Sequence, residues 1–220
     1  MITLLIATRN IHKVGEIRAI LGGSFQFQTL NDFLGAPEVV EDADTFAGNA
    51  AKKAVELARW LSNGSRFTVR DSQFFVLADD SGLEVDALNG APGVHSARFA
   101  APDSAKSGNT SDADNNAKLL RLLKDVPPER RTGRFHCVIA LAETLGPNSK
   151  APDPNLFDGV CEGRILFEPR GKNGFGYDPL FVPVGFERTF AELGEEVKNK
   201  LSHRARALER LKGFLTNKNG

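Results

Sequence analysis

The apolar positions of the N-terminal half follow a repeated strand–helix order. Residues 2–7 form a continuous apolar run, which predicts a strand covered on both faces. Apolar side chains at helical spacing predict a helix over residues 11–21, and alternation predicts a second strand over residues 25–30. A longer helix is expected over residues 45–61, followed by a buried strand over residues 74–79. This order predicts an α/β fold.

Longer strands follow in the C-terminal half. Ser111 is a candidate N-cap for a helix, and two strands that pair as a hairpin are expected over residues 131–145 and 159–169. A last helix is expected over residues 202–215. The whole pattern predicts a mixed sheet flanked by helices. The 220 residues are enough for one large domain, or for two lobes that share a cleft.

Composition and charge narrow the choice of partners and compartment. The 28 basic and 28 acidic residues balance, so the chain lacks the basic surface of a nucleic-acid-binding protein. The two cysteines are Cys137 and Cys161, and the apolar run around Cys137 predicts a buried free thiol. No signal peptide is visible, and the opening residues MITLLIAT are too short to cross a bilayer. We therefore expect a reduced, cytoplasmic protein with no membrane partner.

The stretch ATRNIHK, residues 7–13, joins the first predicted strand to the first predicted helix. Open α/β sheets bind ligands at this end of a strand, and a helix N-terminus favours phosphate. Thr8 and Asn10 can donate hydrogen bonds there, and Lys13 can supply a positive charge. No glycine-rich dinucleotide motif or P-loop accompanies them. The alternative is a solvated N-cap with an ordinary surface lysine.

The stretch LADDSGLEV places two carboxylates where the strand over residues 74–79 is expected to end. Neighbouring side chains of a strand point to opposite faces, so Asp79 and Asp80 can have different roles. A partly desolvated Asp80 favours a bound cation such as Mg²⁺, which takes one or two carboxylates together with substrate phosphates. Asp80 can also accept a proton from an attacking water. Ser81 and Gly82 are expected to form a turn, and a strand-end Asx turn without chemistry is the alternative.

The stretch GKNGFGYDPLFVP, residues 171–183, combines a glycine-rich loop with two large aromatic residues. A mobile glycine loop gains nothing from Phe175 and Tyr177 unless they pack on the core or on a flat ligand. A nucleobase is such a ligand. The alternative is a glycine-rich turn whose aromatic residues are tucked inside.

The stretch VKNKLSHRARAL places basic residues at the start of the last predicted helix. If Ser202 is the N-cap, His203 and Arg204 lie in the first turn, where cations oppose the helix dipole at about 0.3–1 kcal/mol each. Such a placement is expected where an anion or an electron-rich ligand binds, and Lys198 lies one turn upstream. A solvated basic patch is the alternative. Taken together, the four stretches describe a nucleoside triphosphate site.

The same stretches resemble the inosine triphosphate pyrophosphatase family. The matching segments occur in family order and are ATRNIHKVGEI, TFAGNAAKKA, LADDSGLEVDALNGAPGVHSARFA, NNAKLL, RFHCVIAL, GFGYDPLF and LSHRARAL. The resemblance implies that residues 1–220 form a single two-lobed domain with the active-site cleft between the lobes, and that the protein is a homodimer. It also implies Mg²⁺-dependent hydrolysis of ITP, dITP and XTP to the monophosphate and pyrophosphate, which removes deaminated purines from the nucleotide pool.

The resemblance also assigns roles to individual residues. Asp80 would be the general base and a metal ligand, Ser81 would touch the substrate, and Phe175 would stack on the purine. The residues that would hold the triphosphate are Thr8, Arg9, Asn10, Ile11, His12 and Lys13, with help from Lys53. The residues that would shape the base pocket or read the edge of the base are Gly176, Tyr177, Asp178, Lys198, His203 and Arg204.

Two positions depart from the family pattern. Gly48 in TFAGNA replaces an acid, and Val40 replaces a second acid beside Glu41, a possible metal ligand. Glu41 is therefore a weaker metal candidate than Asp80. The stretch SNGSRFTVRDSQF, residues 62–74, is longer than in the family and is expected to form a surface loop and hairpin extension. Two alternatives remain: a pyrophosphatase of the same fold that acts on other modified nucleotides, and a nucleotide-binding module without catalysis.

Overall fold

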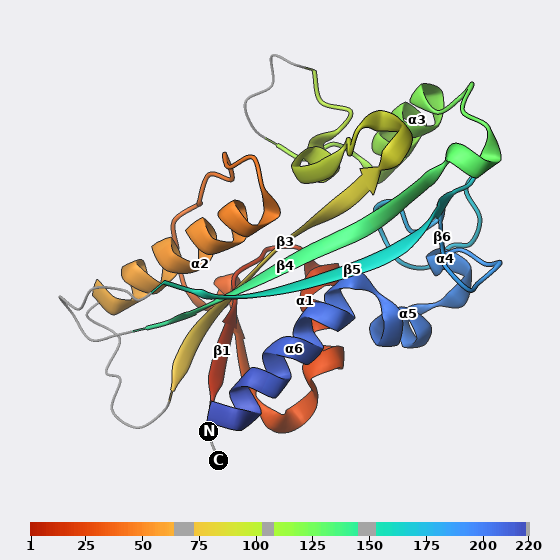
Figure 1. Cartoon of the computed structure of the whole chain (residues 1–220). Helices are drawn as coiled ribbons and strands as arrows, with labels where there is room; N and C mark the ends of the chain where they lie inside the picture. Colours follow the sequence, from red (N-terminus) through yellow and green to blue (C-terminus); the bar gives the residue numbers. More distant parts are fainter. Residues whose placement is uncertain (64–72, 103–107, 145–152, 219–220) are drawn as a thin grey trace. The chain divides into compact units, whose positions relative to one another are not determined.

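The computed structural model describes residues 1–63, 73–102, 108–144 and 153–218 (Figure 1). The strands are β1 (Thr3–Ile6), β2 (Gln26–Thr29), β3 (Phe74–Val85), β4 (Thr132–Glu143), β5 (Asn155–Ile165) and β6 (Phe181–Pro183). The α-helices are α1 (Ile11–Leu21), α2 (Phe46–Asn63), α3 (Asp112–Leu122), α4 (Phe190–Leu193), α5 (Glu195–Leu201) and α6 (His203–Lys218).

The strands form a mixed sheet in the order β2–β1–β3–β4–β5–β6. Strand β1 pairs in parallel with β2 and with β3, whereas β5 and β6 are antiparallel. Strands β4 and β5 are neighbours in this order, as expected for the predicted hairpin. The predicted fold class, a mixed sheet flanked by helices, is confirmed.

The strand expected over residues 74–79 continues beyond its predicted end. Strand β3 runs through Asp79 to Val85, so the predicted turn at Ser81 and Gly82 is wrong. The backbone stays extended because almost every residue of β3 is buried and contributes to the sheet. Gly82 has a different reason to be a glycine, since a Cβ at this position would overlap the Ser96 hydroxyl. The predicted loop and hairpin extension falls mainly on residues 64–72, which lie outside the described residues.

The chain divides into two compact units. Unit 1 comprises Met1–Asp80, Val138–Asp158 and Ala207–Gly220, and unit 2 comprises Ser81–Cys137 and Gly159–Arg206. The boundary passes between two consecutive residues of β3, and β4 and β5 also contribute residues to both units. The expected cleft between two lobes stays a prediction.

The core of unit 1 forms around β1, which lies between two parallel neighbours. Leu4 is aligned with Phe27 of β2 and with Phe75 of β3, and all of β1 is buried, as its continuous apolar run predicts. Helix α2 turns one face toward this unit's interior at the helical spacing seen in the sequence. Its buried residues are Phe46, Asn49, Ala50, Ala54, Leu57, Ala58 and Leu61.

The core of unit 2 contains a group of aromatic rings that pack on one another. The ring centroids of Phe135 and Phe181 lie 4.6 Å apart, and those of Phe181 and Phe190 lie 5.4 Å apart, within the range of favourable aromatic pairs. Leu83 of β3 and Leu119 of α3 join the same buried cluster. Helix α4 contacts both α5 and β6, so the short C-terminal elements of this unit are packed together (Figure 1).

Both cysteines are buried free thiols, as expected for Cys137. Burial raises the pKa of the Cys161 thiol to about 11. Within the described part of the chain, every helix is too short or too polar to cross a membrane.

Candidate active site

The N-terminus of α1 is organised by two residues of the stretch predicted to bind phosphate. The Asn10 side-chain oxygen accepts hydrogen bonds from the backbone N–H groups of His12 and Lys13 at 2.9 and 3.2 Å, which makes Asn10 the N-cap of α1. The Thr8 hydroxyl accepts from the Asn10 N–H at 3.1 Å. Arg9 and Ile11 are exposed. The oxygen of Asn10 therefore orders the helix start, and its amide nitrogen is the group that can donate to a ligand.

Two lysines from different helices meet Asp79 of β3. The Lys13 ammonium of α1 forms an ion pair with the Asp79 carboxylate, which is 1% exposed. The Lys53 ammonium of α2 donates to the backbone oxygen of Asp79 at 3.0 Å and forms an ion pair with Glu41. Lys13 and Lys53 are thus brought to the same point of β3, as the predicted triphosphate site requires. Asp79 thus differs in role from Asp80, as the sequence allows, and holds the Lys13 ammonium.

Asp80 follows directly in β3 and is buried. Burial raises the pKa of the Asp80 carboxyl above its ordinary value, and the nearby Glu41 carboxylate raises it further. The positive charges of Lys13 and Lys53 and a hydrogen bond from Asn49 act in the opposite direction. This environment suits a general base, since a carboxylate with a raised pKa accepts a proton more readily.

The donor set around Asp80 also fits a small divalent cation. The Glu41 carboxylate is close enough to raise the pKa of Asp80. A cation bound between the two carboxylates would relieve this repulsion. Among the described residues there is no group of three or more His, Cys, Asp or Glu side chains that could hold a metal. Mg²⁺ does not need one, because it takes one or two carboxylates together with substrate phosphates and water.

A second group of predicted residues lies in unit 2, on the loop over residues 171–179. The Asp178 carboxylate accepts a hydrogen bond from the backbone N–H of Phe175 at 2.9 Å and pairs with Lys198 of α5 at 2.5 Å. Asp178 and Lys198 are both almost fully buried. Gly174 has a positive φ, and a Cβ there would overlap the Asp178 carboxylate. The loop therefore folds tightly around one buried ion pair.

Basic side chains surround the ring of Phe175. The Lys198 ammonium lies 4.4 Å from the centre of the ring, and the Arg204 guanidinium lies 5.9 Å from it. Arg204 is 1% exposed and donates to the Ser81 hydroxyl at 2.8 Å. The structure thus brings together four of the predicted residues, which are Ser81, Phe175, Lys198 and Arg204.

Two predicted residues of the same region are part of the core of unit 2. Tyr177 is buried, and its hydroxyl donates to the backbone oxygen of Ser96 at 2.9 Å. Burial raises the pKa of the Tyr177 hydroxyl, which stays neutral. His203 stacks on Phe135 at 4.8 Å, while Ser202 caps α6 as expected by accepting from the Ala205 N–H at 3.2 Å. Of the two loop aromatics, Tyr177 is therefore tucked inside, whereas Phe175 is only partly buried.

Comparison with known proteins identifies the family. A model of the Ham1 family matches residues 4–214. The chain belongs to the Ham1 family. A dITP/XTP pyrophosphatase of Opitutus terrae is 46% identical over 215 residues, which cover 94% of this chain and 96% of that protein. A dITP/XTP pyrophosphatase of Desulforamulus reducens is 47% identical over 208 residues, which cover 94% of this chain and 92% of that protein. These relatives confirm the resemblance found in the sequence.

Solved Ham1-family structures share the fold over nearly the whole chain. The structure of a HAM1 protein from Coxiella burnetii matches with a TM-score of 0.76 at 38% identity, covering 99% of this chain and 100% of that one. A nucleoside-triphosphatase, dITP/XTP pyrophosphatase from Mycobacterium abscessus matches with a TM-score of 0.70 at 39% identity, covering 95% and 98%.

The Ham1-family segment TFAGNA contains one residue of the site that the sequence analysis missed. The Asn49 side chain accepts from the backbone N–H of Ala43 at 2.9 Å, donates to the backbone oxygen of Ala43 at 3.2 Å, and hydrogen-bonds Asp80. The sequence did indicate Asn49, because this residue lies one helical turn before Lys53 and therefore on the same face of α2. Asn49 fixes the segment that carries Glu41.

The departure at Gly48 has a physical reason in the same segment. A Cβ at Gly48 would lie 2.8 Å from the Cβ of Ala43 and 3.0 Å from the hydroxyl of Thr45. Any side chain at this position therefore requires the turn before α2 to move. In this chain the turn therefore packs directly against the helix backbone at Gly48.

Proposed function

We propose that the protein is a Mg²⁺-dependent pyrophosphatase that hydrolyses ITP, dITP and XTP to the nucleoside monophosphate and pyrophosphate. The observation that carries this proposal is the environment of Asp80, a buried carboxylate of raised pKa within the electrostatic reach of Lys13 and Lys53. The two relatives described above, which are dITP/XTP pyrophosphatases, support the same reaction.

In the proposed reaction, the chain binds the triphosphate with positive charge and activates water with a carboxylate. Lys53 leaves Glu41 and binds phosphate oxygens together with Lys13, which stays beside the buried Asp79, and the N-terminus of α1 helps to bind them. Asp80 takes a proton from a water molecule, the water oxygen bonds to phosphorus, and the bond between the α- and β-phosphates breaks to release pyrophosphate. Asp80 and Glu41 are the residues that would hold Mg²⁺, which when bound neutralises charge on the phosphate oxygens.

The unit 2 residues are proposed to bind the base. Phe175 stacks on the purine. Hypoxanthine and xanthine present a carbonyl oxygen where adenine presents an amino group, and hydrogen-bond donors favour the oxygen. The donors available for this purpose are Lys198, His203 and Arg204. We also propose, from the family resemblance, that the protein acts on the cytoplasmic nucleotide pool as a homodimer.

A steady-state screen of nucleoside triphosphates tests the proposal. Pyrophosphate release is measured for ITP, dITP, XTP, dUTP, GTP and ATP, with Mg²⁺ and with EDTA. We expect release from ITP, dITP and XTP in the presence of Mg²⁺, and little release from ATP, whose base carries an amino group in place of that carbonyl. A preference for dUTP would instead favour a pyrophosphatase for other modified nucleotides. Binding of ITP without any release of pyrophosphate would favour a nucleotide-binding module without catalysis.

A further inference from the structure

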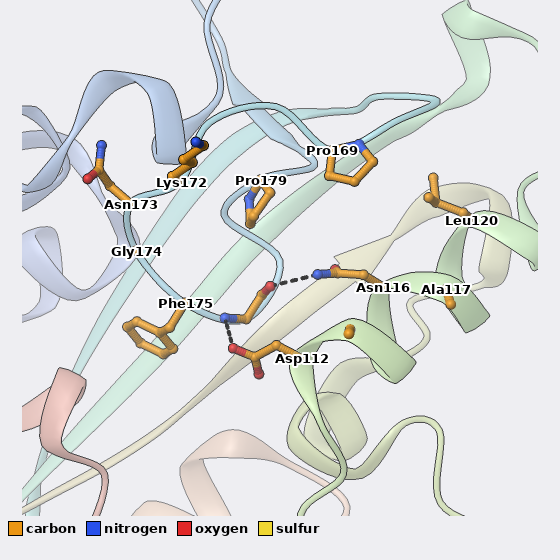
Figure 2. Close-up of a pocket in the computed structure, with 12 residues that line it drawn as sticks. Asp112, Asn116, Ala117, Leu120, Pro169, Lys172, Asn173, Gly174, Phe175 and Pro179 are labelled. Atoms are coloured by element: carbon orange, nitrogen blue, oxygen red, sulfur yellow. Dashed lines mark hydrogen bonds between the residues drawn. The ribbon is translucent and has the colours of Figure 1, made fainter.

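Helix α3 holds the loop of Phe175 from a side that the predicted site does not include. The Asp112 carboxylate accepts from the backbone N–H of Gly176 at 2.6 Å, and the Asn116 amide donates to the backbone oxygen of Gly176 at 3.0 Å (Figure 2). Asp112 and Asn116 are four residues apart and therefore lie on one face of α3. Both polar groups of the Gly176 backbone are thus held by one helix.

These two hydrogen bonds cross a hollow between α3 and the loop. A pocket of about 460 Å³ is lined by one face of α3, by residues 172–176 and by the prolines Pro169 and Pro179 (Figure 2). Close packing therefore does not fix the distance from α3 to Gly176. Gly176 has a φ of +62°, and a Cβ there would meet no atom within 4 Å. The position of Gly176 depends on directional hydrogen bonds to α3.

Helix α3 is itself firmly anchored and can serve as a support. Asn115 is buried, and its side-chain oxygen accepts from the backbone N–H of Ala100 at 2.8 Å and from the hydroxyl of Thr110 at 2.7 Å. Leu119 of the same helix is fully buried in the core of unit 2. A loop tied to such an element is held more precisely than one tied to another loop.

We propose that Asp112 and Asn116 are positioning residues that set purine selectivity by fixing Gly176, and through it the ring of Phe175. The inference rests on the proposed role of Phe175 in stacking on the base. The loop is also fixed by the buried Asp178–Lys198 pair, because Asp178 accepts from the backbone N–H of Phe175. The ring of Phe175 is therefore attached between two anchors, and loss of the α3 anchor lets it move into the hollow.

The matched variants Asp112→Ala and Asp114→Ala test this proposal. Both remove one acidic residue from the first turn of α3, so their effects on the helix dipole are alike. Only Asp112 contacts Gly176, whereas Asp114 pairs with the N-cap Ser111. We expect Asp112→Ala to raise KM for ITP about tenfold with little change in kcat, and to lower the ratio of kcat/KM for ITP over ATP, because a small misplacement of a positioning group has effects of this size. Asp114→Ala should leave both values unchanged.

Three further comparisons separate positioning from a loss of folding. Asp112→Asn, which keeps an acceptor oxygen, should recover part of the selectivity. Asn116→Ala should act in the same direction, and the double variant should lose less than the product of the two effects because both act on Gly176. Hydrogen–deuterium exchange over residues 172–178 should accelerate in Asp112→Ala but not in Asp114→Ala.

The outcomes distinguish this inference from the proposed function. Equal effects of Asp112→Ala and Asp114→Ala, or unchanged exchange over residues 172–178 in Asp112→Ala, would overturn the inference even if the wild type hydrolyses ITP. If Phe175→Ala leaves the ratio of kcat/KM for ITP over ATP unchanged, the stacking role of Phe175 is wrong. The selectivity role of Asp112 and Asn116 is then wrong as well. A wild-type chain that releases no pyrophosphate from ITP overturns the proposed function, and exchange over residues 172–178 still shows whether α3 holds the loop.

Discussion

The two groups of site residues hold their charges in different ways. In unit 1, the paired side chains of Lys53 and Glu41 are 12% and 32% exposed, and Lys13 is 17% exposed although its partner Asp79 is only 1% exposed. In unit 2, the ion-paired side chains of Lys198 and Asp178 are 3% and 2% exposed. Ion pairs that are accessible to water exchange partners at a small cost in free energy, whereas separating a buried pair costs much more. The Lys53–Glu41 pair of unit 1 is thus suited to release Lys53 to a phosphate, and the Asp178–Lys198 pair of unit 2 to keep a fixed shape.

Replacing Asp80 is expected to have the largest effect. In Asp80→Asn the proton acceptor is lost, and we expect kcat for ITP to fall by about 10²–10⁴-fold. Pyrophosphate release measures the loss, and binding of ITP, measured by calorimetry, should persist. Turnover near the wild-type rate in this variant would show that another group activates the water.

The same variant gives a pH-dependent change in stability of known sign. Burial raises the pKa of Asp80, so the folded protein retains this proton to higher pH than the unfolded chain does. The contribution of Asp80 to stability is therefore full below the ordinary Asp pKa and falls as the pH rises through the raised pKa. We expect the Tm of Asp80→Asn to exceed that of the wild type at neutral pH, and the difference to shrink in acid. A Tm difference that is independent of pH would contradict this account.

The fixed character of unit 2 is tested by two lysines of α5. Lys198→Met leaves the Asp178 carboxylate buried without its partner, and we expect the free energy of unfolding to fall by about 3–5 kcal/mol. Lys200→Met is the matched control, because Lys200 pairs with Glu196 at the surface, where loss of the pair changes stability little. Urea unfolding measures both variants. Equal losses would mean that burial of the Asp178–Lys198 pair does not distinguish unit 2.

Two adjacent lysines of α2 test whether Lys53 can exchange its carboxylate partner for a phosphate. We expect Lys53→Met to raise KM for ITP by about 10–100-fold, because a charged hydrogen bond to phosphate is lost. Lys52→Met should stay within about twofold of the wild type, since Lys52 pairs with the exposed Asp42 and surface pairs contribute little. A large change in stability for Lys53→Met, without a change in KM, would assign this lysine to the fold instead.

The smallest expected effect concerns the glycines of α1 and α2. Replacing a helical glycine with alanine usually stabilises a protein by up to about 1 kcal/mol, and Gly15→Ala should do so because a Cβ there meets no atom within 4 Å. In Gly48→Ala the new Cβ would lie 2.8 Å from that of Ala43, and overpacking should cancel or reverse the gain. Thermal unfolding compares the two variants. Equal stabilisation would show that the turn before α2 moves freely.

Local pattern predicted the regular elements but not their continuation or their contacts. Helix α1 has the predicted bounds because apolar spacing, a capping Asn10 and a following glycine pair all lie within the helix or beside it. The predicted end of β3 was wrong because Ser81 and Gly82 are typical of turns. Only the contact of Gly82 with a distant segment shows that they continue the strand. Elements as short as α4 and β6 contain too few residues to show a period.

The candidate site was predictable where chemistry depends on residue type. A carboxylate near a strand end and a lysine near a helix start indicated Asp80 and Lys13, the family resemblance added Lys53, and the structure brings the three together. Asp112 and Asn116 could not be found in this way, because their importance arises from contact with a loop about 60 residues further along the chain. Contacts of such separation depend on the tertiary fold and leave no local pattern.

The buried cysteines make the native protein resistant to thiol reagents. Alkylation needs an accessible thiolate, and Cys161 is both enclosed and held protonated by its pKa of about 11. Labelling of Cys137 and Cys161 can then proceed only when the chain opens, so the rate of maleimide incorporation reports the frequency of opening. Every variant described above carries this internal probe, which separates an inactive but intact enzyme from one that has begun to unfold.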